Sequence, residues 1–340
     1  MIIRKKGMVD MQNILAQFAM QQLGFGPVGE IRLLHGGSGN AYNYFRDKIN
    51  EANMHQYVSQ AEAAMVTQRN DVMLVTPDSH AWRGDLHATG AALTWDKTNC
   101  HMIGLTPGEK SAYMRARFGH SGYTMANFMT VSGAANLFKN LRWMHGSATG
   151  GASDVTCLTV TGAGNIYDHC NFAGPMDATQ AATAAYLGVV VSGSSNHFKS
   201  CSFGTSNFID RAAANAMLKL SGTGQLNVFE DCIFWSHANT TTPFFINWAS
   251  SECASFSAIF LNCKFLNTKA AAESALAYAI TDSSHANCSL FFDERCVFTG
   301  TTDIIALASE TKVMMGGANP DTTAIGDDLA LGLAQNPNVS

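Results

Sequence analysis

The sequence predicts an all-β fold, a right-handed parallel β-helix (a solenoid) in which one short pattern returns coil after coil. Three observations predict it. A cysteine column recurs at 31-residue intervals, with a further copy 33 residues later: Cys170, Cys201, Cys232, Cys263 and Cys296. A phenylalanine follows each of these cysteines by two residues: Phe172, Phe203, Phe234, Phe265 and Phe298. In four copies of the pattern a glycine stands three residues before an asparagine: Gly133, Gly162, Gly193 and Gly224 precede Asn136, Asn165, Asn196 and Asn227.

The spacing inside each copy indicates strands that are joined by a bend. The cysteine and the following phenylalanine keep the two-residue alternation of one strand face. An aromatic residue stands three positions before the cysteine site, at Phe138, Tyr167, Phe198, Phe229 and Phe260, and this odd interval requires the chain to turn. Polar residues occupy the turn, at Asn140, His169, Ser200, Asp231 and Asn262. Because stacked strands lie about 4.8 Å apart, we expect the cysteine and phenylalanine columns to form a structural core ladder with free thiols.

Composition limits the possible functions of the chain. Of its 340 residues 46% are hydrophobic and 14% are charged, which indicates an ordered protein with a large core. The net charge is −5 and basic residues cluster only at Arg4-Lys5-Lys6, so we expect no nucleic-acid partner. No apolar run is long enough to span a bilayer, and we expect no membrane partner. The histidines and cysteines show no metal-ligand spacing, so neither a metal nor a cofactor is predicted.

The chain divides into three predicted parts. Residues 1–55 form an N-terminal arm with an amphipathic helix over Met11–Leu23, which either caps the coil or docks on a partner through Ile14, Leu15 and Phe18. Residues 56–315 form the β-helix, with an entry cap made of a helix over 58–68 and a strand over 72–75. Residues 316–340 form a C-terminal tail.

The sequence resembles the pectate-lyase-like superfamily of right-handed β-helices. The residues that carry this resemblance are Tyr57-Val58-Ser59, Ala61 to Val66, Asn70 to Pro77, and the repeated N-x-F-x-N/S-C-x-F pattern. In particular, the chain is similar to β-helical virion structural proteins of tailed bacteriophages. The resemblance implies assembly in a bacterial host cytoplasm and a final place on the virion, at the capsid surface or on a spike.

The acidic residues are the candidates for an enzymatic function. Asp168 and Glu230 share a column two coils apart, about 9.6 Å by strand spacing, with Lys199 between them. Glycosidases need a pair of carboxyl groups at a defined separation, and these two fall at a polar turn. We therefore interpret them as turn residues and predict that the protein is not an enzyme.

Two hypotheses follow for function. The first is a non-enzymatic capsid decoration or cement protein, a homotrimer whose arm docks on the major capsid protein or another virion protein. The nine cysteines, which lack a C-x-x-C pair, favour reduced thiols and synthesis in a cytosol. The alternative is a carbohydrate-binding or carbohydrate-cleaving tailspike, either a glycosidase or a polysaccharide lyase. Trp235, which is expected in an edge loop, could serve this alternative as a sugar platform.

Overall fold

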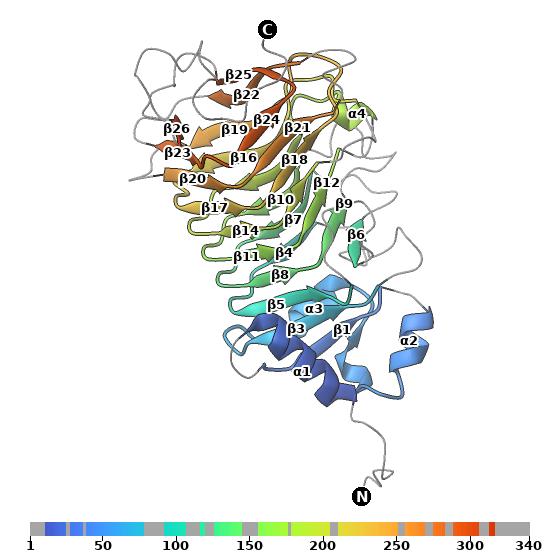
Figure 1. The fold of residues 1–340 in the computed structure, drawn as a ribbon. Coiled ribbons are helices and arrows are strands. Elements are labelled where there is room, and N and C mark those ends of the chain that lie inside the picture. The colour runs from blue at the N-terminus through green and yellow to red at the C-terminus, as the bar shows by residue number, and fades with distance from the viewer. Residues whose placement is uncertain are drawn as a thin grey trace, which may run out of the picture.

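The protein folds as a parallel β-helix of three sheets, which confirms the predicted fold class (Figure 1). The structure is a computed structural model that describes residues 11–24, 28–36, 39–77, 92–106, 116–119, 126–144, 156–175, 178–204, 210–250, 256–268, 275–282, 288–305 and 313–316. Strands of successive coils pair in parallel and keep equivalent residues in register, for example Phe172 with Phe203. Residues 1–10 and 317–340, with the basic cluster and nearly all of the predicted tail, lie outside the described residues.

Each complete coil gives one strand to each of the three sheets, and sheet A also includes three earlier strands of the chain at its N-terminal end. Sheet A has eleven strands, in the order β2 (Met54–His55), β1 (Ile31–Leu34), β3 (Asp71–Val75), β5 (Cys100–Gly104), β8 (Leu137–Lys139), β11 (Ile166–Asp168), β14 (His197–Lys199), β17 (Asn227–Glu230), β20 (Phe256–Leu261), β23 (Ser289–Phe292) and β26 (Val313–Met315). Sheet B has eight, in the order β25 (Thr301–Ile305), β22 (Leu276–Asp282), β19 (Phe244–Ser250), β16 (Ala216–Gly222), β13 (Leu187–Val191), β10 (Thr156–Val160), β7 (Asn127–Val131) and β4 (Leu93–Trp95). Sheet C has seven, in the order β24 (Val297–Thr299), β21 (Lys264–Asn267), β18 (Ile233–Ser236), β15 (Ser202–Phe203), β12 (Asn171–Ala173), β9 (Arg142–Met144) and β6 (Arg117–Gly119).

Most of the helices lie at the N-terminal end of the coil (Figure 1). They are α1 (Met11–Leu23), α2 (Gly39–Phe45), α3 (Val58–Ala64) and a 3-10 turn (Glu51–Asn53), and the short α4 (Ala178–Ala181) lies further along the chain. The sequence predicts both α1 and α3, although α3 ends at residue 64 rather than 68. Val58 and Ala61 of α3 pack into the main core, so this helix covers the open end of the coil.

Helix α1 lies against the outer face of sheet A, across its N-terminal strands (Figure 1). Strand β3 shows why this face needs a cover. Met73 points into the coil core, whereas Val72 and Leu74 point outward into a second apolar cluster that includes α1. Strand β1, from within the predicted arm, pairs with β3 in the same sheet. Strand β1 is therefore part of the folded sheet, although it lies within residues 1–55. The domain boundary at residue 55 stays a prediction.

The coil interior is filled by aromatic rings stacked between coils. Phe198 and Phe229 have ring centroids 4.8 Å apart and planes within 4°, and Phe203 and Phe234 are 4.5 Å apart and within 7°. Each fully buried ring contributes on the order of 1.5–3 kcal/mol. All five cysteines and five phenylalanines of the predicted core ladder are buried here: Cys170, Cys201, Cys232, Cys263, Cys296, Phe172, Phe203, Phe234, Phe265 and Phe298.

The column thiols are free, and each donates a hydrogen bond to a backbone carbonyl of the preceding coil. The Sγ of Cys201, for example, lies 3.2 Å from the carbonyl oxygen of Tyr167. Burial raises the pKa of the Cys201, Cys232 and Cys263 thiols well above the ordinary value, so these groups are unreactive. Cys288 departs from the expectation of reduced cysteines because it takes part in a disulfide bond. It stands outside the repeated column, so the repeat gave no information about its state.

Tyr167 interrupts the inner phenylalanine column. Its ring stacks between Phe138 and Phe198, at 5.0 and 4.6 Å, but its buried hydroxyl has no hydrogen-bond partner among the described residues. Removing an unsatisfied buried hydroxyl recovers its desolvation penalty of about 1–3 kcal/mol. We therefore expect Tyr167→Phe to raise the free energy of unfolding by about that amount, as measured by urea denaturation.

The matched control for this prediction is Tyr42→Phe. The Tyr42 hydroxyl donates to Glu51 Oε1 at 2.8 Å on the surface, so its removal should not stabilise the protein. If Tyr167→Phe left the unfolding midpoint unchanged or lowered it, the Tyr167 hydroxyl must have a partner.

Glu62 makes the cap sensitive to pH. It is buried on α3, and its Oε1 lies 3.5 Å from Lys97 Nζ, which in turn lies 3.4 Å from Asp96 Oδ1. Burial raises the pKa of Glu62 from 4.5 to about 7, although the charge of Lys97 opposes the shift. The folded state therefore holds a proton that the unfolded state loses between about pH 4.5 and 7. Over this window the contribution of Glu62 to stability should fall with rising pH, by on the order of 3 kcal/mol.

The pH prediction is tested with Glu62→Gln. Melting curves of the wild type and the variant, recorded from pH 4.5 to 7.5, should converge at low pH and separate as the pH rises, with the variant more stable at pH 7.5. The exposed Glu294→Gln is the control and should follow the wild type. A constant difference between the Glu62→Gln and wild-type curves would show that Glu62 does not titrate in this window.

Candidate functional site

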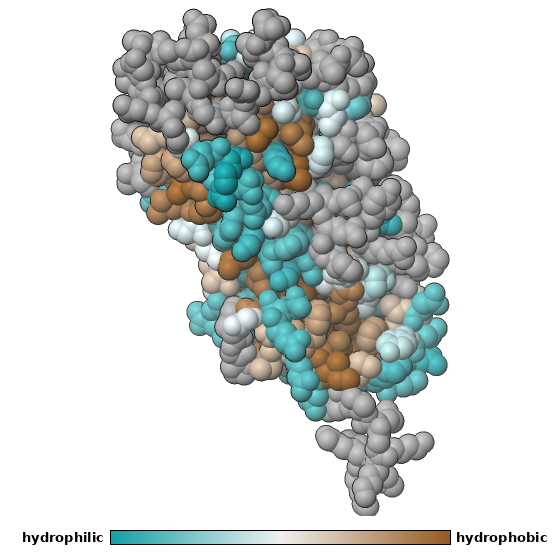
Figure 2. All heavy atoms as spheres, viewed as in Figure 1, coloured by the Kyte–Doolittle hydropathy of each residue, from teal (hydrophilic) through white to brown (hydrophobic). Residues whose placement is uncertain are grey.

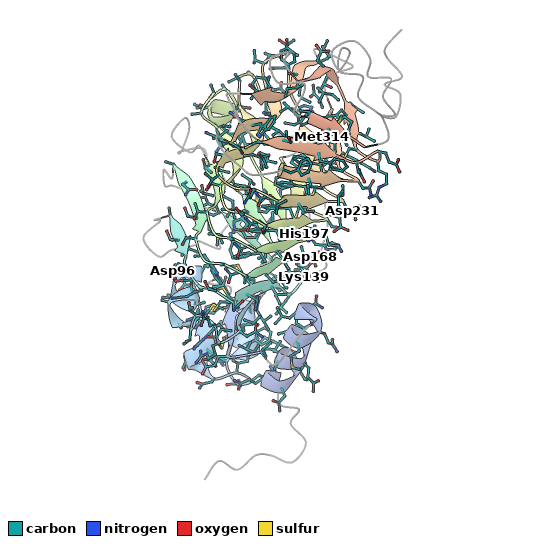
Figure 3. The ribbon with its side chains drawn as sticks, turned by 90° about the vertical axis from the view of Figure 1, so that its left-hand side faces the viewer. Asp96, Lys139, Asp168, His197, Asp231 and Met314 are labelled. Carbon is teal, nitrogen blue, oxygen red and sulfur yellow. The ribbon has the colours of Figure 1, made fainter. Side chains whose placement is uncertain are left out.

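A row of charged side chains runs along the outer face of sheet A, and we call it the charged ladder. It consists of Lys139, Asp168, Lys199 and Glu230, the last residues of β8, β11, β14 and β17. Backbone pairing sets Asp168 opposite Lys139 and Lys199, and Lys199 opposite Glu230. Each follows a buried ring of the inner column, so strand alternation turns its side chain outward. Figure 3 shows Lys139, Asp168, His197 and Asp231 one above another on successive coils.

The charged ladder contains two ion pairs between neighbouring coils. Lys139 Nζ lies 2.7 Å from Asp168 Oδ2, and Lys199 Nζ lies 3.9 Å from Glu230 Oε1. Asp168 and Glu230 are two strand steps apart in the register of sheet A, which is about 9.6 Å between their backbones. Lys199 therefore stands between two carboxylates and presents its ammonium group at the middle of the ladder.

Each carboxylate of the ladder also holds an imidazole. His169 Nδ1 lies 2.5 Å from Asp168 Oδ1, and His197 Nε2 lies 3.0 Å from Glu230 Oε2. The imidazoles are accessible, with 41% of the His169 side chain and 34% of the His197 side chain exposed. A carboxylate fixes both the orientation and the tautomer of an imidazole, which is the arrangement of a general base.

Asp168 remains ionised at neutral pH. Burial acts to raise its pKa, but hydrogen bonds from Lys139 and His169, with their charges, outweigh burial and hold the pKa below the usual range. An ionised Asp168 neutralises Lys139 and keeps His169 in place. The Asp168 carboxylate thus keeps its negative charge across the physiological pH range.

The bend residues frame the ladder at the corner between sheets A and C. Asn140, His169, Ser200, Asp231 and Asn262 all adopt the left-handed conformation, with φ between 51° and 56°. This conformation is uncommon outside glycine, and the repeated polar residues at the bend follow from it. Asn262 Nδ2 donates to Asp231 Oδ1 at 2.6 Å, so Asp231 holds the corner together. In Figure 2 a hydrophilic band follows the front of the coil.

Other predicted site residues lie elsewhere. The cysteine and phenylalanine columns are in the core, on the inner side of the sheets. The thiols contact the ladder residues at their backbone, as Cys201 Sγ does when it donates to the carbonyl oxygen of Lys199 at 3.3 Å. All three proposed docking residues are on α1: Leu15 is buried, Phe18 is partly buried, and Ile14 is 42% exposed. Docking through this helix stays a prediction. Trp235 lies on β18. Its predicted position in an edge loop is therefore wrong.

Sequence reasoning found both carboxylates but missed their imidazole partners. His197 and Glu230 contact each other across neighbouring coils, although 33 residues separate them along the chain. Only the register of β14 against β17 reveals the pair. Among the described residues no group of three or more His, Cys, Asp or Glu side chains could hold a metal ion, and no described helix is long and apolar enough to cross a membrane.

Comparison with known proteins gives likeness of structure only. No protein-family model matches the sequence, and no curated protein matches it either. A pectin methylesterase from Aspergillus niger has a TM-score of 0.52 at 14% sequence identity, over 93% of this chain and 92% of that one. A pectin methylesterase from Erwinia chrysanthemi has a TM-score of 0.41 at 11% identity, over 92% and 98% of the two chains. ORF18 of Geobacillus virus E2 has a TM-score of 0.37 at 9% identity, over 92% and 63%.

These findings correct one prediction and limit another. The prediction that the protein is not an enzyme is contradicted, because the chain shares its fold over most of its length with a pectin methylesterase. The prediction rested on Asp168 and Glu230 as turn residues and did not include their imidazole partners His169 and His197. Identity of 14% shows the fold alone, and the β-helix part of the resemblance is confirmed. The phage-specific part, the capsid partner, the trimer and the virion location stay predictions.

Proposed function

We propose that the protein is a carbohydrate-active β-helix that hydrolyses an ester on a polysaccharide bound along the charged ladder. The observation that carries this proposal is the presence of two imidazole–carboxylate pairs and a central lysine on consecutive coils of one exposed sheet face. A base beside a cation can catalyse ester hydrolysis, because the base activates water and the cation stabilises the developing oxyanion. The fold shared with a pectin methylesterase supports the same class of substrate.

The His197–Glu230 pair is the proposed base. Glu230 faces Nε2 of His197, which favours the tautomer with its proton on Nε2 and leaves Nδ1 to accept one. In the proposed reaction a water oxygen attacks the ester carbonyl carbon while its proton moves to Nδ1. The bond between the carbonyl carbon and the ester oxygen then breaks, and the same proton passes to the leaving alkoxide. The products are a carboxylic acid and an alcohol.

Lys199 is the proposed electrostatic group. Its ammonium lies beside the His197–Glu230 pair and projects from the same strand as His197, two residues away. Two residues along a strand place both side chains on the same face, about 6.6 Å apart at the backbone. A cation in this position stabilises the negative charge that develops on the carbonyl oxygen. The Asp168–His169 pair, on the preceding coil, is then available to bind sugar hydroxyl groups.

The test is product analysis on defined polysaccharides. The purified protein is incubated with methyl-esterified pectin, acetylated xylan and their unesterified forms, and released methanol, acetate and reducing ends are measured together. We expect methanol or acetate to appear without new reducing ends. New reducing ends would show cleavage of the chain and overturn the esterase assignment. Absence of both binding and product on every polysaccharide would overturn the proposed function.

A further inference from the structure

A second group of polar and aromatic side chains lies on the outer face of sheet C, and we call it the indole site. It consists of Trp235, His237, Asp210 and Thr268. Trp235 is on β18 between the buried Phe234 and Ser236, so strand alternation turns its indole outward. His237 follows two residues later and projects from the same face. Trp235 is partly exposed, whereas Trp95, Trp143 and Trp248 are fully buried.

His237 is held between two neighbouring chain segments. Its Nε2 lies 3.3 Å from Asp210 Oδ1, and its Nδ1 lies 2.8 Å from Thr268 Oγ1. The backbone fixes this row, because Arg211 pairs with Ala238 in a parallel bridge and Thr268 N donates to the carbonyl oxygen of Ser236 at 2.8 Å. Asp210, His237 and Thr268 therefore stand side by side on consecutive coils.

A buried arginine supports the row from beneath. Arg211 donates from Nε to Asn215 Oδ1 at 2.8 Å, from Nη1 to Ser236 Oγ at 2.9 Å and from Nη2 to the carbonyl oxygen of Phe244 at 2.8 Å. These bonds tie Ser236, which precedes His237, and Phe244 to the chain segment around Arg211. The site is thus built on rigid backbone, which suits recognition by a preorganised surface.

The chemistry of the indole site fits an uncharged sugar ring. A partly exposed tryptophan offers a flat apolar surface, and tryptophan is enriched at binding hot spots. Asp210, 41% exposed, and the exposed Thr268 flank His237, two residues after Trp235, and each offers an acceptor oxygen. The Thr268 hydroxyl itself donates to the carbonyl oxygen of Ser236 at 3.2 Å. A carboxylate at this position disfavours an anionic sugar through like-charge repulsion.

We propose that the indole site binds a neutral pyranose unit of the polysaccharide, with the apolar face of the sugar on Trp235 and its hydroxyls toward Asp210 and Thr268. The inference rests on the proposed function and adds a specificity contact outside the charged ladder. Glu230 and Trp235 belong to the same coil, on opposite sides of the corner between sheets A and C. Trp235 follows Glu230 by five positions, which is at most roughly 17 Å along the chain, so a polysaccharide of several sugars can reach both.

The test uses tryptophan fluorescence in the full chain. The Trp82→Phe variant removes the one tryptophan outside the described residues and leaves Trp235 as the accessible reporter. The probes are mannohexaose, cellohexaose and maltohexaose, with hexagalacturonate as the anionic comparison. We expect at least one neutral oligosaccharide to shift the emission and to protect the indole from acrylamide quenching, with weaker binding of hexagalacturonate.

Substitutions then locate the contact. In isothermal titration the Trp235→Leu and Asp210→Asn variants should each bind the neutral probe roughly 10-fold more weakly, about 1.4 kcal/mol. Trp235→Tyr, which keeps a ring, should retain most of the affinity. Trp248→Phe, in the core, should bind as the wild type does. Unchanged affinity of Trp235→Leu, equal binding of hexagalacturonate, or no response to any neutral probe would each overturn the inference.

The two proposals fail separately. If esters are hydrolysed and Trp235→Leu has the wild-type KM, the indole site is not a sugar contact and the esterase proposal stands. If neutral oligosaccharides bind at Trp235 but no ester is hydrolysed, the sugar contact stands and the esterase proposal is wrong.

Discussion

Replacing Asn196 with alanine is expected to lower the free energy of unfolding by about 2–5 kcal/mol. The side chain is fully buried, and its Oδ1 accepts a hydrogen bond from the backbone N–H of Asn165 at 3.0 Å. Its Nδ2 donates to the carbonyl oxygen of Gly162 and to Asn227 Oδ1, both at 3.1 Å. Alanine removes these bonds between three coils. Each buried polar group left unsatisfied costs about 1–3 kcal/mol.

Urea denaturation followed by circular dichroism measures this loss. The matched control is Asn43→Ala on the exposed side of α2, which should change stability by no more than about 0.5 kcal/mol. Asn196→Asp keeps the oxygen that accepts from Asn165 but loses both amide donations, so it should also destabilise the protein. A loss below 1 kcal/mol for Asn196→Ala would mean that the asparagine ladder contributes little to the stacking of the coils.

The glycine and asparagine columns explain why the fold could be predicted from the sequence. Asn165 Nδ2 donates to the carbonyl oxygen of Gly133, and Asn227 Nδ2 donates to that of Gly193, both at 3.0 Å. A side chain at Gly193 would place a Cβ 2.0 Å from the carbonyl oxygen of Gly162, so the turn admits only glycine there without moving. Both constraints join equivalent positions of consecutive coils. They therefore repeat with the period of the coil and can be seen in one sequence.

Features that do not repeat from coil to coil could not be predicted from the sequence. The outward residues Val72 and Leu74 of β3 alternate with inward ones, but nothing in the sequence shows that α1 covers them. The pair formed by His197 and Glu230 joins different positions of neighbouring coils, so it leaves no column. Local spacing also placed Trp235 in a loop, whereas pairing with Leu266 extends β18 to include it. Register between strands, rather than the repeat itself, decides each of these cases.

The largest effect on activity is expected from His197→Gln. General acid–base catalysis by a positioned side chain contributes about 10²–10⁴-fold to a rate. Glutamine cannot accept and return a proton as imidazole does, so we expect kcat for ester hydrolysis to fall by a factor in that range. KM should change little, because His197 acts on the water rather than on the sugar. Lys199→Met should lower kcat by about 10²–10³-fold through loss of the charge that stabilises the oxyanion.

Two comparisons separate catalysis from folding in this experiment. Lys264→Met is the matched control for Lys199→Met, because Lys264 is an exposed lysine on the outer face of sheet C and should leave kcat unchanged. Glu230→Gln keeps an oxygen near His197 Nε2 but removes the charge that orients the imidazole, so its kcat should lie between those of the wild type and His197→Gln. Melting temperatures of all four variants should stay close to that of the wild type, because these side chains lie on the surface. If His197→Gln retained more than a tenth of the wild-type kcat while Asp168→Asn abolished turnover, the base would be His169 on the preceding coil, and the roles of the two pairs would be exchanged.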